Sequence, residues 1–294
     1  MTAYLNGEFL PLSAARISPL DRGFLLGDGV YEVIPVYSRR PFRIAEHLRR
    51  LQDSLDGIRL ANPLADEAWR AIVERLVTDA ESPDQSVYLQ VTRGADDKRE
   101  QAFPVGVAPT VFAFTAPLVA PSDAVRAAGV GAITVPDIRW AKCDLKAVSL
   151  LANVLLRQQA VEAGCAEAIM LRDGFLTEGA ASNIFAVKDG VILTPPQDGR
   201  ILPGITYDVV LELAARHGAA HEIRPVTEAE LRGADELWMT SSTKEVLAIV
   251  TLDGRPVGRS DDPAHPPGRP GPVTRRMHDW YRTFRDEVMR HADA

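Results

Sequence analysis

One lysine is a candidate for amine chemistry. Only five of the 33 basic residues are lysines, so a reaction that needs a primary amine has few candidates. Lys146 lies in the apolar segment Cys143-Asp-Leu-Lys-Ala-Val-Ser-Leu-Leu151. An amine buried there would lose hydration of its charged form and become more nucleophilic, as a Schiff-base lysine must be. Taken alone, Lys146 is better explained as a lysine that extends to solvent from a helix start.

Other residues supply the remaining parts of a pyridoxal 5'-phosphate site. The ring nitrogen of this cofactor needs a carboxylate, and Glu178 stands at the end of a predicted strand. The phosphate needs helix N–H groups, hydroxyls and an arginine. These groups are present in the predicted helix start Pro203–Thr206, in the hydroxyl run Thr240–Thr243 and in Arg50. Each has a structural explanation by itself, but together they predict a site for this cofactor.

Three other patterns are incomplete. His217 and His221 have the spacing of metal ligands, but Gly218 interrupts them, so we predict a surface pair and no metal site. Ser241 to Lys244 has the S-x-x-K spacing of serine acyl-transfer enzymes without their K-T-G strand, and we predict a hydroxyl-rich turn. The chain has no G-x-G-x-x-G motif and no P-loop.

The hydrophobic pattern predicts an α+β chain of two domains with mixed sheets. We expect a smaller N-terminal α/β domain at 1–116, a proline-containing linker at 117–124 and a larger, mixed α/β, cofactor-binding domain at 125–294. Strands are predicted at 4–10 with a hairpin turn at Asn6-Gly7, and at 87–91, 110–116, 129–135, 235–240 and 246–252. Further hairpin turns are predicted at Asp173-Gly174 and Asp189-Gly190.

Apolar spacing of three and four predicts the helices. They are expected from Ile44 to Ile58, around 69–77, from about Val148 to Ala163, from Ile205 to Gly218, and around 277–288. Thr227 and Glu230 form a capping box for a further short helix. The segment 255–272, rich in proline and glycine, is expected to be a loose surface loop.

Composition limits the possible partners. The net charge is −7 and no basic run with interleaved aromatic residues is present, so we expect no nucleic-acid binding. Two cysteines form neither a zinc spacing nor a disulfide framework. The N-terminus lacks the features of a secretion signal, and no apolar stretch is long enough to cross a membrane. The expected location is the cytoplasm.

At the candidate residues the sequence resembles the fold-type IV pyridoxal-phosphate aminotransferases, and most of all the bacterial D-amino acid aminotransferases. The matching segments run nearly end to end. They are Asp21–Val33, Glu46–Leu51, Gln90–Gly94, Asp137–Trp140, Cys143–Lys146, Thr177–Gly179 with Ser182-Asn183, Leu202–Thr206 and Thr240–Thr243. The resemblance implies the two-domain α+β fold of that family, with a homodimer as the assembly.

The resemblance also implies a role for each candidate residue. Lys146 would hold the cofactor as a Schiff base and move the proton, and Glu178 would pair with the ring nitrogen. The remaining roles are phosphate binding by Arg50, Ile205 (through its backbone), Thr206 and Ser242, support of the ring by Ser241, and a place near the reacting carbon for Tyr31.

The match is weaker where the family recognises the substrate. D-amino acid aminotransferases hold the substrate carboxylate with an Arg-x-His pair, but here Arg99 is followed by Glu100 and Gln101. Glutamine carries no charge, and Glu100 would oppose a carboxylate if it faced inward. Carboxylate binding could therefore be weaker, amines without a carboxylate could be accepted, or the loop could have no substrate role.

These observations favour transfer of an amino group from a D-amino acid to a 2-oxo acid, either pyruvate or 2-oxoglutarate. The alternatives on the same scaffold are a branched-chain L-amino acid transaminase, an (R)-amine transaminase and an aminodeoxychorismate lyase. From another class, the protein could bind pyridoxal phosphate without catalysis. The pairing of Lys146 with Glu178 argues against that, because storage does not need a ring that accepts electrons.

Overall fold

The computed structural model describes residues 1–259 and 266–291, and these form two compact units. Unit 1 comprises Met1–Val119, Leu145–Leu150 and Asp286–Ala294, and unit 2 comprises Ala120–Asp144 and Leu151–Arg285. The chain first passes between them at Val119–Ala120, within the segment 117–124. Two later segments, Leu145–Leu150 and Asp286–Ala294, also group with unit 1. The domain bounds of 1–116 and 125–294 therefore stay a prediction.

Unit 1 is built on an antiparallel sheet with the strand order β2-β1-β6-β5-β3-β4. The strands are β1 (Thr2–Leu5), β2 (Glu8–Pro11), β3 (Gly29–Tyr37), β4 (Arg40–Pro41), β5 (Gln85–Thr92) and β6 (Thr110–Pro117). The predicted Asn6-Gly7 turn is confirmed, since it joins β1 to β2 and Asn6 has φ +48°. Asparagine tolerates this left-handed conformation better than most residues.

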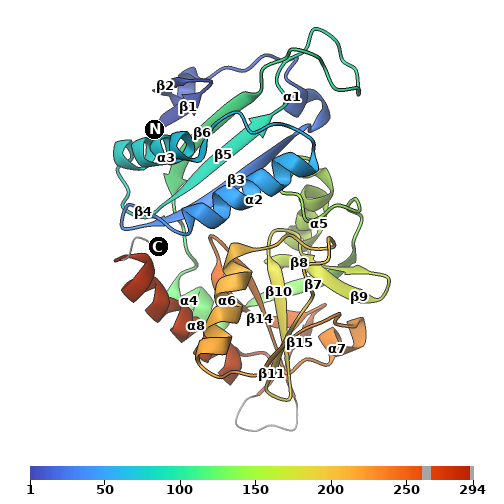
Figure 1. Cartoon of the computed structure of the whole chain (residues 1–294). Coiled ribbons are helices and arrows are strands. Elements are labelled where there is room, and N and C mark those ends of the chain that lie inside the picture. The colour runs from blue at the N-terminus through green and yellow to red at the C-terminus, as the bar shows by residue number, and fades with distance from the viewer. Residues whose placement is uncertain (260–265, 292–294) are drawn as a thin grey trace. The chain divides into compact units, whose positions relative to one another are not determined.

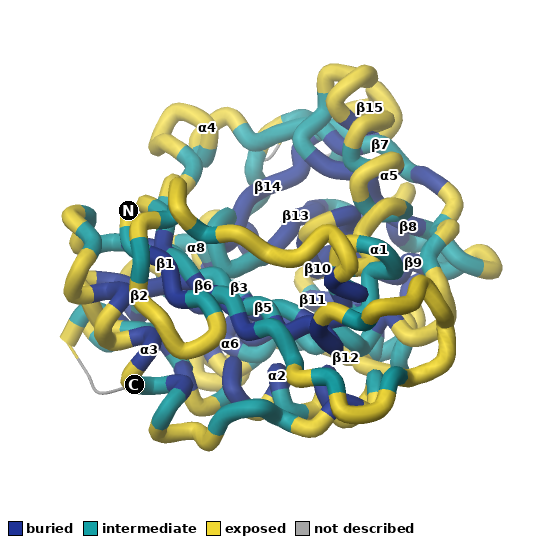
Figure 2. Tube along the Cα trace, turned by 90° about the horizontal axis from the view of Figure 1, so that it is seen from above, coloured by how far each residue is buried: buried dark blue, intermediate teal, exposed yellow. Residues whose placement is uncertain are grey.

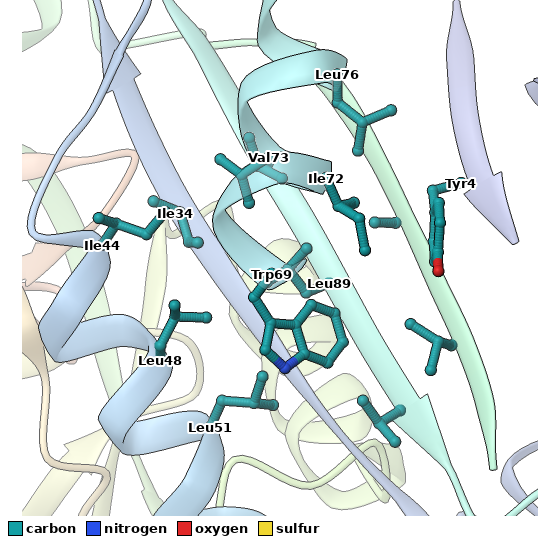
Figure 3. Close-up of a cluster of buried hydrophobic side chains, with 14 of the residues drawn as sticks. Tyr4, Ile34, Ile44, Leu48, Leu51, Trp69, Ile72, Val73, Leu76 and Leu89 are labelled. Atoms are coloured by element: carbon teal, nitrogen blue, oxygen red, sulfur yellow. The ribbon is translucent and has the colours of Figure 1, made fainter. Parts of the chain in front are cut away.

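Two amphipathic helices cover one face of this sheet (Figure 1). They are α2 (Ile44–Gly57) and α3 (Asp66–Asp79), and both predicted helices are thereby confirmed. Their apolar side chains pack against β3 and β5 around the fully buried Trp69 (Figure 3). Complete burial of a large apolar side chain stabilises a fold by about 1.5–3 kcal/mol. Unit 1 also contains η1 (Leu12–Ala14) and α1 (Arg22–Leu26).

Unit 2 contains a mixed sheet with the order β12-β11-β10-β13-β14-β7-β8-β9, and β15 pairs with β14. The strands are β7 (Val130–Pro136), β8 (Glu167–Arg172), β9 (Phe175–Gly179), β10 (Asn183–Lys188), β11 (Val191–Thr194), β12 (His221–Ile223), β13 (Glu236–Ser241), β14 (Glu245–Leu252) and β15 (Arg255–Pro256). The α+β class is confirmed, although the mixed sheet is found in unit 2 only. Strands β13 and β14 are buried along most of their length (Figure 2).

The helices of unit 2 are α4 (Asp123–Ala128), α5 (Leu151–Glu162), α6 (Ile205–Arg216), α7 (Glu228–Arg232) and α8 (Pro272–Phe284). A π-helical turn, η2 (Arg285–Met289), follows, and all of it except Arg285 is grouped with unit 1. The capping box of Thr227 and Glu230 is confirmed at α7. Both Asp-Gly dipeptides form the predicted turns, between β8 and β9 and between β10 and β11. Of the predicted surface loop at 255–272, residues 260–265 lie outside the described part.

One predicted helix boundary is wrong. The helix expected from about Val148 begins at Leu151, because the chain before it is extended. The backbone of residues 147–148 pairs with β3 and forms no helical turn. The Val148 N–H donates to the Gly29 carbonyl at 3.0 Å, and Ala147 forms a bridge with Val30. Within residues 1–259 and 266–291, no helix has the length and apolar character needed to span a membrane.

Candidate active site

Lys146 lies in the extended segment Leu145–Leu150, which unit 1 holds against β3 and α2. The Lys146 backbone N–H donates to Ser54 Oγ at 3.1 Å, and its carbonyl accepts from the Tyr31 N–H at 2.9 Å. Gly57, at the end of α2, leaves room for this segment: a Cβ there would come within 2.3 Å of the Leu145 side chain. Backbone contacts on both sides therefore fix the position of Lys146.

The Lys146 amine lies over an aromatic ring. Nζ is 4.2 Å from the centroid of the Tyr31 ring, a cation–π distance. The structure thus brings together two of the predicted site residues. The side chain is half-buried, whereas the sequence pattern led us to expect burial. The non-repetitive segment 137–145 separates Lys146 from β7, and β7 itself is only partly buried.

Tyr31 belongs to a row of half-buried aromatic residues on the face of the unit 1 sheet opposite to α2 and α3. Its ring stacks on Tyr88, which in turn contacts Phe114. Burial raises the pKa of Tyr88 to about 12, so its hydroxyl stays protonated and donates to Gln90 Oε1 at 2.6 Å. The sequence contained a signal for this row, because the residues between Val87, Leu89 and Val91 must share the other face.

Arg50, predicted to bind phosphate, forms a buried ion pair in unit 1. Its Nε and Nη2 donate to the two carboxylate oxygens of Glu32 at 2.7 and 2.8 Å. Burial alone would raise the pKa of Glu32, but Arg50 and His47 outweigh it and hold the pKa far below its usual range. The carboxylate is therefore ionised and fixes the orientation of the guanidinium. Glu32 was not among the predicted site residues, although it precedes Val33 in the matching segment.

Arg99 and Gln101 lie in the exposed loop between β5 and β6 of unit 1. The Glu100 side chain is also exposed and forms no ion pair with Arg99 within the described chain. Glu100 therefore does not neutralise the charge of Arg99. The Arg99 guanidinium therefore keeps a positive charge that suits a carboxylate.

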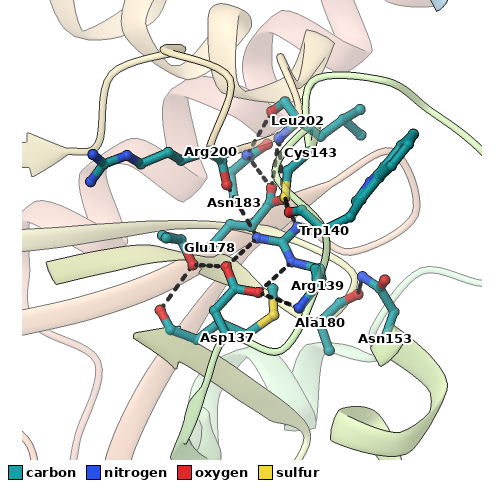
Figure 4. Close-up of polar contacts among 12 residues, drawn as sticks. Asp137, Arg139, Trp140, Cys143, Asn153, Glu178, Ala180, Asn183, Arg200 and Leu202 are labelled. Carbon is teal, nitrogen blue, oxygen red and sulfur yellow. Dashed lines mark hydrogen bonds and ion pairs between the residues drawn. The ribbon is translucent and has the colours of Figure 1, made fainter. Parts of the chain in front are cut away.

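Glu178 lies at the centre of a polar network in unit 2 (Figure 4). Its carboxylate forms an ion pair with Arg139 and accepts the Leu202 backbone N–H at 3.1 Å. Arg139 also binds Asp137 with Nη2 at 2.9 Å. Arg139 was not among the predicted site residues, although it lies in the matching segment Asp137–Trp140. The pattern of an arginine two residues after an aspartate is too common to indicate this pairing.

Burial raises the pKa of Glu178 to about 7. Arg139 and the Leu202 N–H act in the opposite direction, but the negative charge of Asp137 adds to the increase. One arginine shared between two carboxylates therefore does not stabilise the ionised form of Glu178 completely. A cationic group beside Glu178 would supply the missing positive charge. This requirement fits the protonated ring nitrogen of pyridoxal phosphate.

Asn183 connects Glu178 to the predicted phosphate-binding groups. Its Nδ2 donates to Glu178 Oε2 at 3.1 Å and to the Leu202 carbonyl at 3.0 Å, two residues before Gly204. Its backbone lies opposite Thr240 in the β10–β13 pair. Gly204 is required here, because a Cβ would lie 2.0 Å from Asn183 Oδ1. Unit 2 thus brings Glu178, the start of α6 and the end of β13 together.

The predicted phosphate-binding residues of unit 2 have suitable chemistry. Helix α6 begins after Gly204 without a side-chain cap, so the first N–H groups, those of Ile205 and Thr206, are available to an anion. Ser241, the last residue of β13, and Ser242, in the turn after it, are half-buried, and Ser241 Oγ accepts the Lys244 N–H at 3.1 Å. The residues present fit a phosphate group.

The other candidate patterns have structural explanations. The His217 ring stacks on Trp280 with centroids 4.3 Å apart, and His221 begins β12. Across the described ranges, no cluster of histidine, cysteine, aspartate or glutamate could hold a metal ion. The Lys244 ammonium binds the buried Glu167 at 3.1 Å, so it is not the base of a serine nucleophile.

Comparison with known proteins agrees with this chemistry. The family model described as amino-transferase class IV matches residues 29–252. The chain is 38% identical to a D-alanine aminotransferase of Bacillus licheniformis, with 94% of each chain covered. It is 37% identical to a D-alanine aminotransferase of Staphylococcus aureus (strain MW2), with 96% of each covered. The branched-chain amino acid aminotransferase of Escherichia coli has a similar structure, with a TM-score of 0.86 and 27% identity over 95% of this chain and 92% of that one.

Proposed function

The chain belongs to the class IV aminotransferases, and from this premise we propose that it transfers the amino group of a D-amino acid, with D-alanine as the first candidate, to a 2-oxo acid. Enzymes of this family depend on pyridoxal 5'-phosphate. One observation supports this choice of substrate. The relatives that are 36–38% identical to the chain along almost its whole length are named D-alanine aminotransferases.

When bound, pyridoxal phosphate supplies an aldehyde that condenses with amines and a ring that withdraws electrons. Lys146 Nζ is the amine assigned to hold the cofactor and, once free, to take the proton from the substrate carbon. The Tyr31 ring, 4.2 Å away, restricts where that amine can lie. Glu178, with its buried carboxyl supported by Arg139, is assigned to pair with the ring nitrogen.

We assign the phosphate of the cofactor to hydrogen-bond donors whose positions the fold already fixes. The backbone N–H groups of Ile205 and Thr206 begin α6, and the hydroxyls of Thr206, Ser241 and Ser242 are nearby along the same unit. Arg50 is oriented by Glu32, which supports its use as a fixed cation. The substrate carboxylate is assigned to Arg99, with Gln101 as an additional hydrogen-bond donor.

The activity test is direct. The holoenzyme is incubated with D-alanine and 2-oxoglutarate, and pyruvate is measured with a coupled reduction. We expect many turnovers with the acceptor present and a single equivalent of pyruvate at most without it, because each cycle must return the amino group to a 2-oxo acid. If no D-amino acid supports turnover, the proposal is wrong.

A branched-chain L-amino acid transaminase is the second candidate. It is supported by the similarity to the solved structures of branched-chain enzymes. One of these, from Thermoproteus uzoniensis with norvaline, has a TM-score of 0.83 and 27% identity, and the match covers 97% of this chain and 94% of that one. Adding L-leucine and an (R)-amine to the substrate panel separates these activities from the first. Release of pyruvate from aminodeoxychorismate, with no 2-oxo acid acceptor present, would instead indicate a lyase.

An exposed apolar face of α5 supports assembly as a homodimer. Leu151, Val154 and Leu155 are 71%, 59% and 51% exposed and recur at the spacing of one helix face. Exposed apolar patches of this kind mark interaction sites, and we assign this one to a second copy of the chain. We expect Leu155→Glu to weaken the dimer by about tenfold or more. Sedimentation velocity measures this, with Ile223→Glu as the control, because Ile223 is 52% exposed and lies in β12, away from this helix. An unchanged dimer in Leu155→Glu would exclude this face.

A further inference from the structure

The loop from Ala95 to Pro109, which carries Arg99 and Gln101, is attached to unit 1 by a buried arginine. Arg22 is only 3% exposed. Its Nη1 donates to the Glu100 carbonyl at 2.6 Å, and its Nη2 donates to the Gln101 carbonyl at 3.2 Å. These two carbonyls belong to the peptide groups on either side of the Gln101 Cα. The guanidinium therefore fixes the backbone next to Arg99, 78 residues away in sequence.

The orientation of Arg22 is itself determined by an aspartate. Arg22 Nε donates to Asp28 Oδ2 at 2.8 Å. The same carboxylate accepts two hydrogen bonds from Arg93, at 2.8 and 3.0 Å. Burial by itself would raise the pKa of Asp28, but Arg93 and Arg22 outweigh it and lower the pKa. Asp28 is therefore an ionised acceptor that holds two guanidinium groups in fixed planes.

A second contact attaches the loop on its C-terminal side. The Arg93 guanidinium lies 3.8 Å from the centroid of the Phe103 ring, and Arg59 lies 5.3 Å from the same centroid. Phe103 is 48% exposed, and both arginine side chains pack against its ring. The loop is thus held at Glu100, Gln101 and Phe103, all within five residues of Arg99.

The residue before Arg22 closes the base of the loop. Asp21 Oδ2 accepts hydrogen bonds from Thr92 Oγ1 at 2.9 Å and from Thr110 Oγ1 at 2.7 Å. Thr92 ends β5 and Thr110 begins β6, so Asp21 joins the two ends of the loop. The Asp21-Arg22 pair therefore holds both the base and the middle of a segment that has no regular structure. Without such contacts, the loop residues would retain conformational freedom that substrate binding would have to remove.

From these contacts we propose that Arg22 is a positioning residue for substrate binding: it holds the carbonyls of Glu100 and Gln101 and thereby sets where the Arg99 guanidinium lies. The inference rests on the proposed role of Arg99 in binding the substrate carboxylate. It explains why a buried cation is bound to an exposed loop. Fixing the loop before substrate arrives removes an ordering cost from binding, so the effect should be on KM.

The test replaces Arg22 with lysine in the holoenzyme. Lysine keeps the charge, but its single ammonium cannot reach Asp28 and both carbonyls in the directions of the planar guanidinium. We expect KM for D-alanine and for 2-oxoglutarate to rise about tenfold, with a smaller change in kcat, as a misplaced binding group would cause. The near-visible absorbance of the cofactor should not change.

Arg39→Lys is the matched control. Arg39 also donates to three backbone carbonyls of unit 1, those of Val77, Ala80 and Glu81, but it does not contact the loop. Arg39→Lys should leave KM at the wild-type value. Trypsin adds a readout that is independent of activity, since cleavage after Lys98 or Arg99 should be faster in Arg22→Lys than in Arg39→Lys.

Arg99→Ala separates this inference from the proposed function. If Arg99 binds the carboxylate, Arg99→Ala raises KM, and adding Arg22→Lys to it causes little further increase, because Arg22 acts through Arg99. If Arg99→Ala has no effect, the carboxylate role is wrong and the inference is overturned with it. If Arg99→Ala raises KM but Arg22→Lys does not, only the inference is overturned.

A second variant covers the case in which Arg22→Lys does not fold. Phe103 is exposed enough for Phe103→Ala to be tolerated, and this change removes the contact with Arg93. It should raise KM in the same direction and increase trypsin cleavage of the loop. Faster cleavage of the loop in Phe103→Ala at a wild-type KM would contradict the proposal.

Discussion

Replacing Lys146 with alanine is expected to abolish transamination, with kcat lower by roughly 10⁴-fold, the upper end of what a positioned general acid–base contributes. The proposed reaction needs an amine that both holds the cofactor and moves a proton. Backbone hydrogen bonds to Ser54 and Tyr31 hold Lys146 at one defined position, close to the Tyr31 ring. Turnover of D-alanine with 2-oxoglutarate measures the effect.

Borohydride reduction identifies the lysine independently of turnover. Reduction of the holoenzyme followed by peptide mapping should attach the pyridoxyl group to Lys146, and Lys146→Ala should carry no label. Lys142 is the matched control, since it is exposed and only four residues away. Lys142→Ala should retain the label and the activity. Label on another lysine would exclude the assignment of Lys146.

Replacing Glu178 with glutamine is expected to lower kcat by about 10²-fold, a typical loss for one electrostatic contact in an active site. A neutral amide cannot stabilise a cationic ring nitrogen, whereas the buried carboxylate can. Arg139 would keep its ion pair with Asp137, so the surrounding network should remain. Lys146 should still be labelled by borohydride in this variant, which separates the loss of the ring partner from a loss of the cofactor.

The same variant has a pH signature in the cofactor-free protein. The pKa of Glu178 is raised from its ordinary 4.5 to about 7 by burial. The folded state therefore binds this proton more tightly than the unfolded state, and the resulting stability is complete below pH 4.5 and is lost as the pH rises towards 7. Relative to Glu178→Gln, the free energy of unfolding of the wild type should decrease across this range.

Denaturant titration at several pH values measures this difference. Bound pyridoxal phosphate should reduce the decrease, because a cation beside the carboxyl favours the ionised form. Glu236→Gln is the control for the removal of a buried carboxylate, since Glu236 accepts N–H groups of Val273 and Thr274 elsewhere in unit 2. It should lower stability but keep kcat. A pH-independent difference between the wild type and Glu178→Gln would contradict the raised pKa.

Structural features that depend on a few neighbouring residues could be predicted from the sequence. The Asn6-Gly7 turn and both Asp-Gly turns follow from the backbone conformations that these residues tolerate. The Thr227–Glu230 capping box needs only groups three residues apart. The helices α2 and α3 follow from apolar spacing, because each must bury one face. The matching segments around Lys146 and Glu178 indicated the family before the fold was known.

Contacts between distant segments were decided by the tertiary structure alone. The chain at Lys146 is extended, although its composition suits a helix, because β3 supplies hydrogen-bond partners more than a hundred residues away in sequence. Arg139 pairs with Glu178 across 39 residues, and Arg22 binds Glu100 across 78. Local chemistry determined which elements form and which residues could react. Which polar groups pair with each other depends on how the strands and helices pack in the folded protein. The burial that raises the pKa of Glu178 exists only in that folded state.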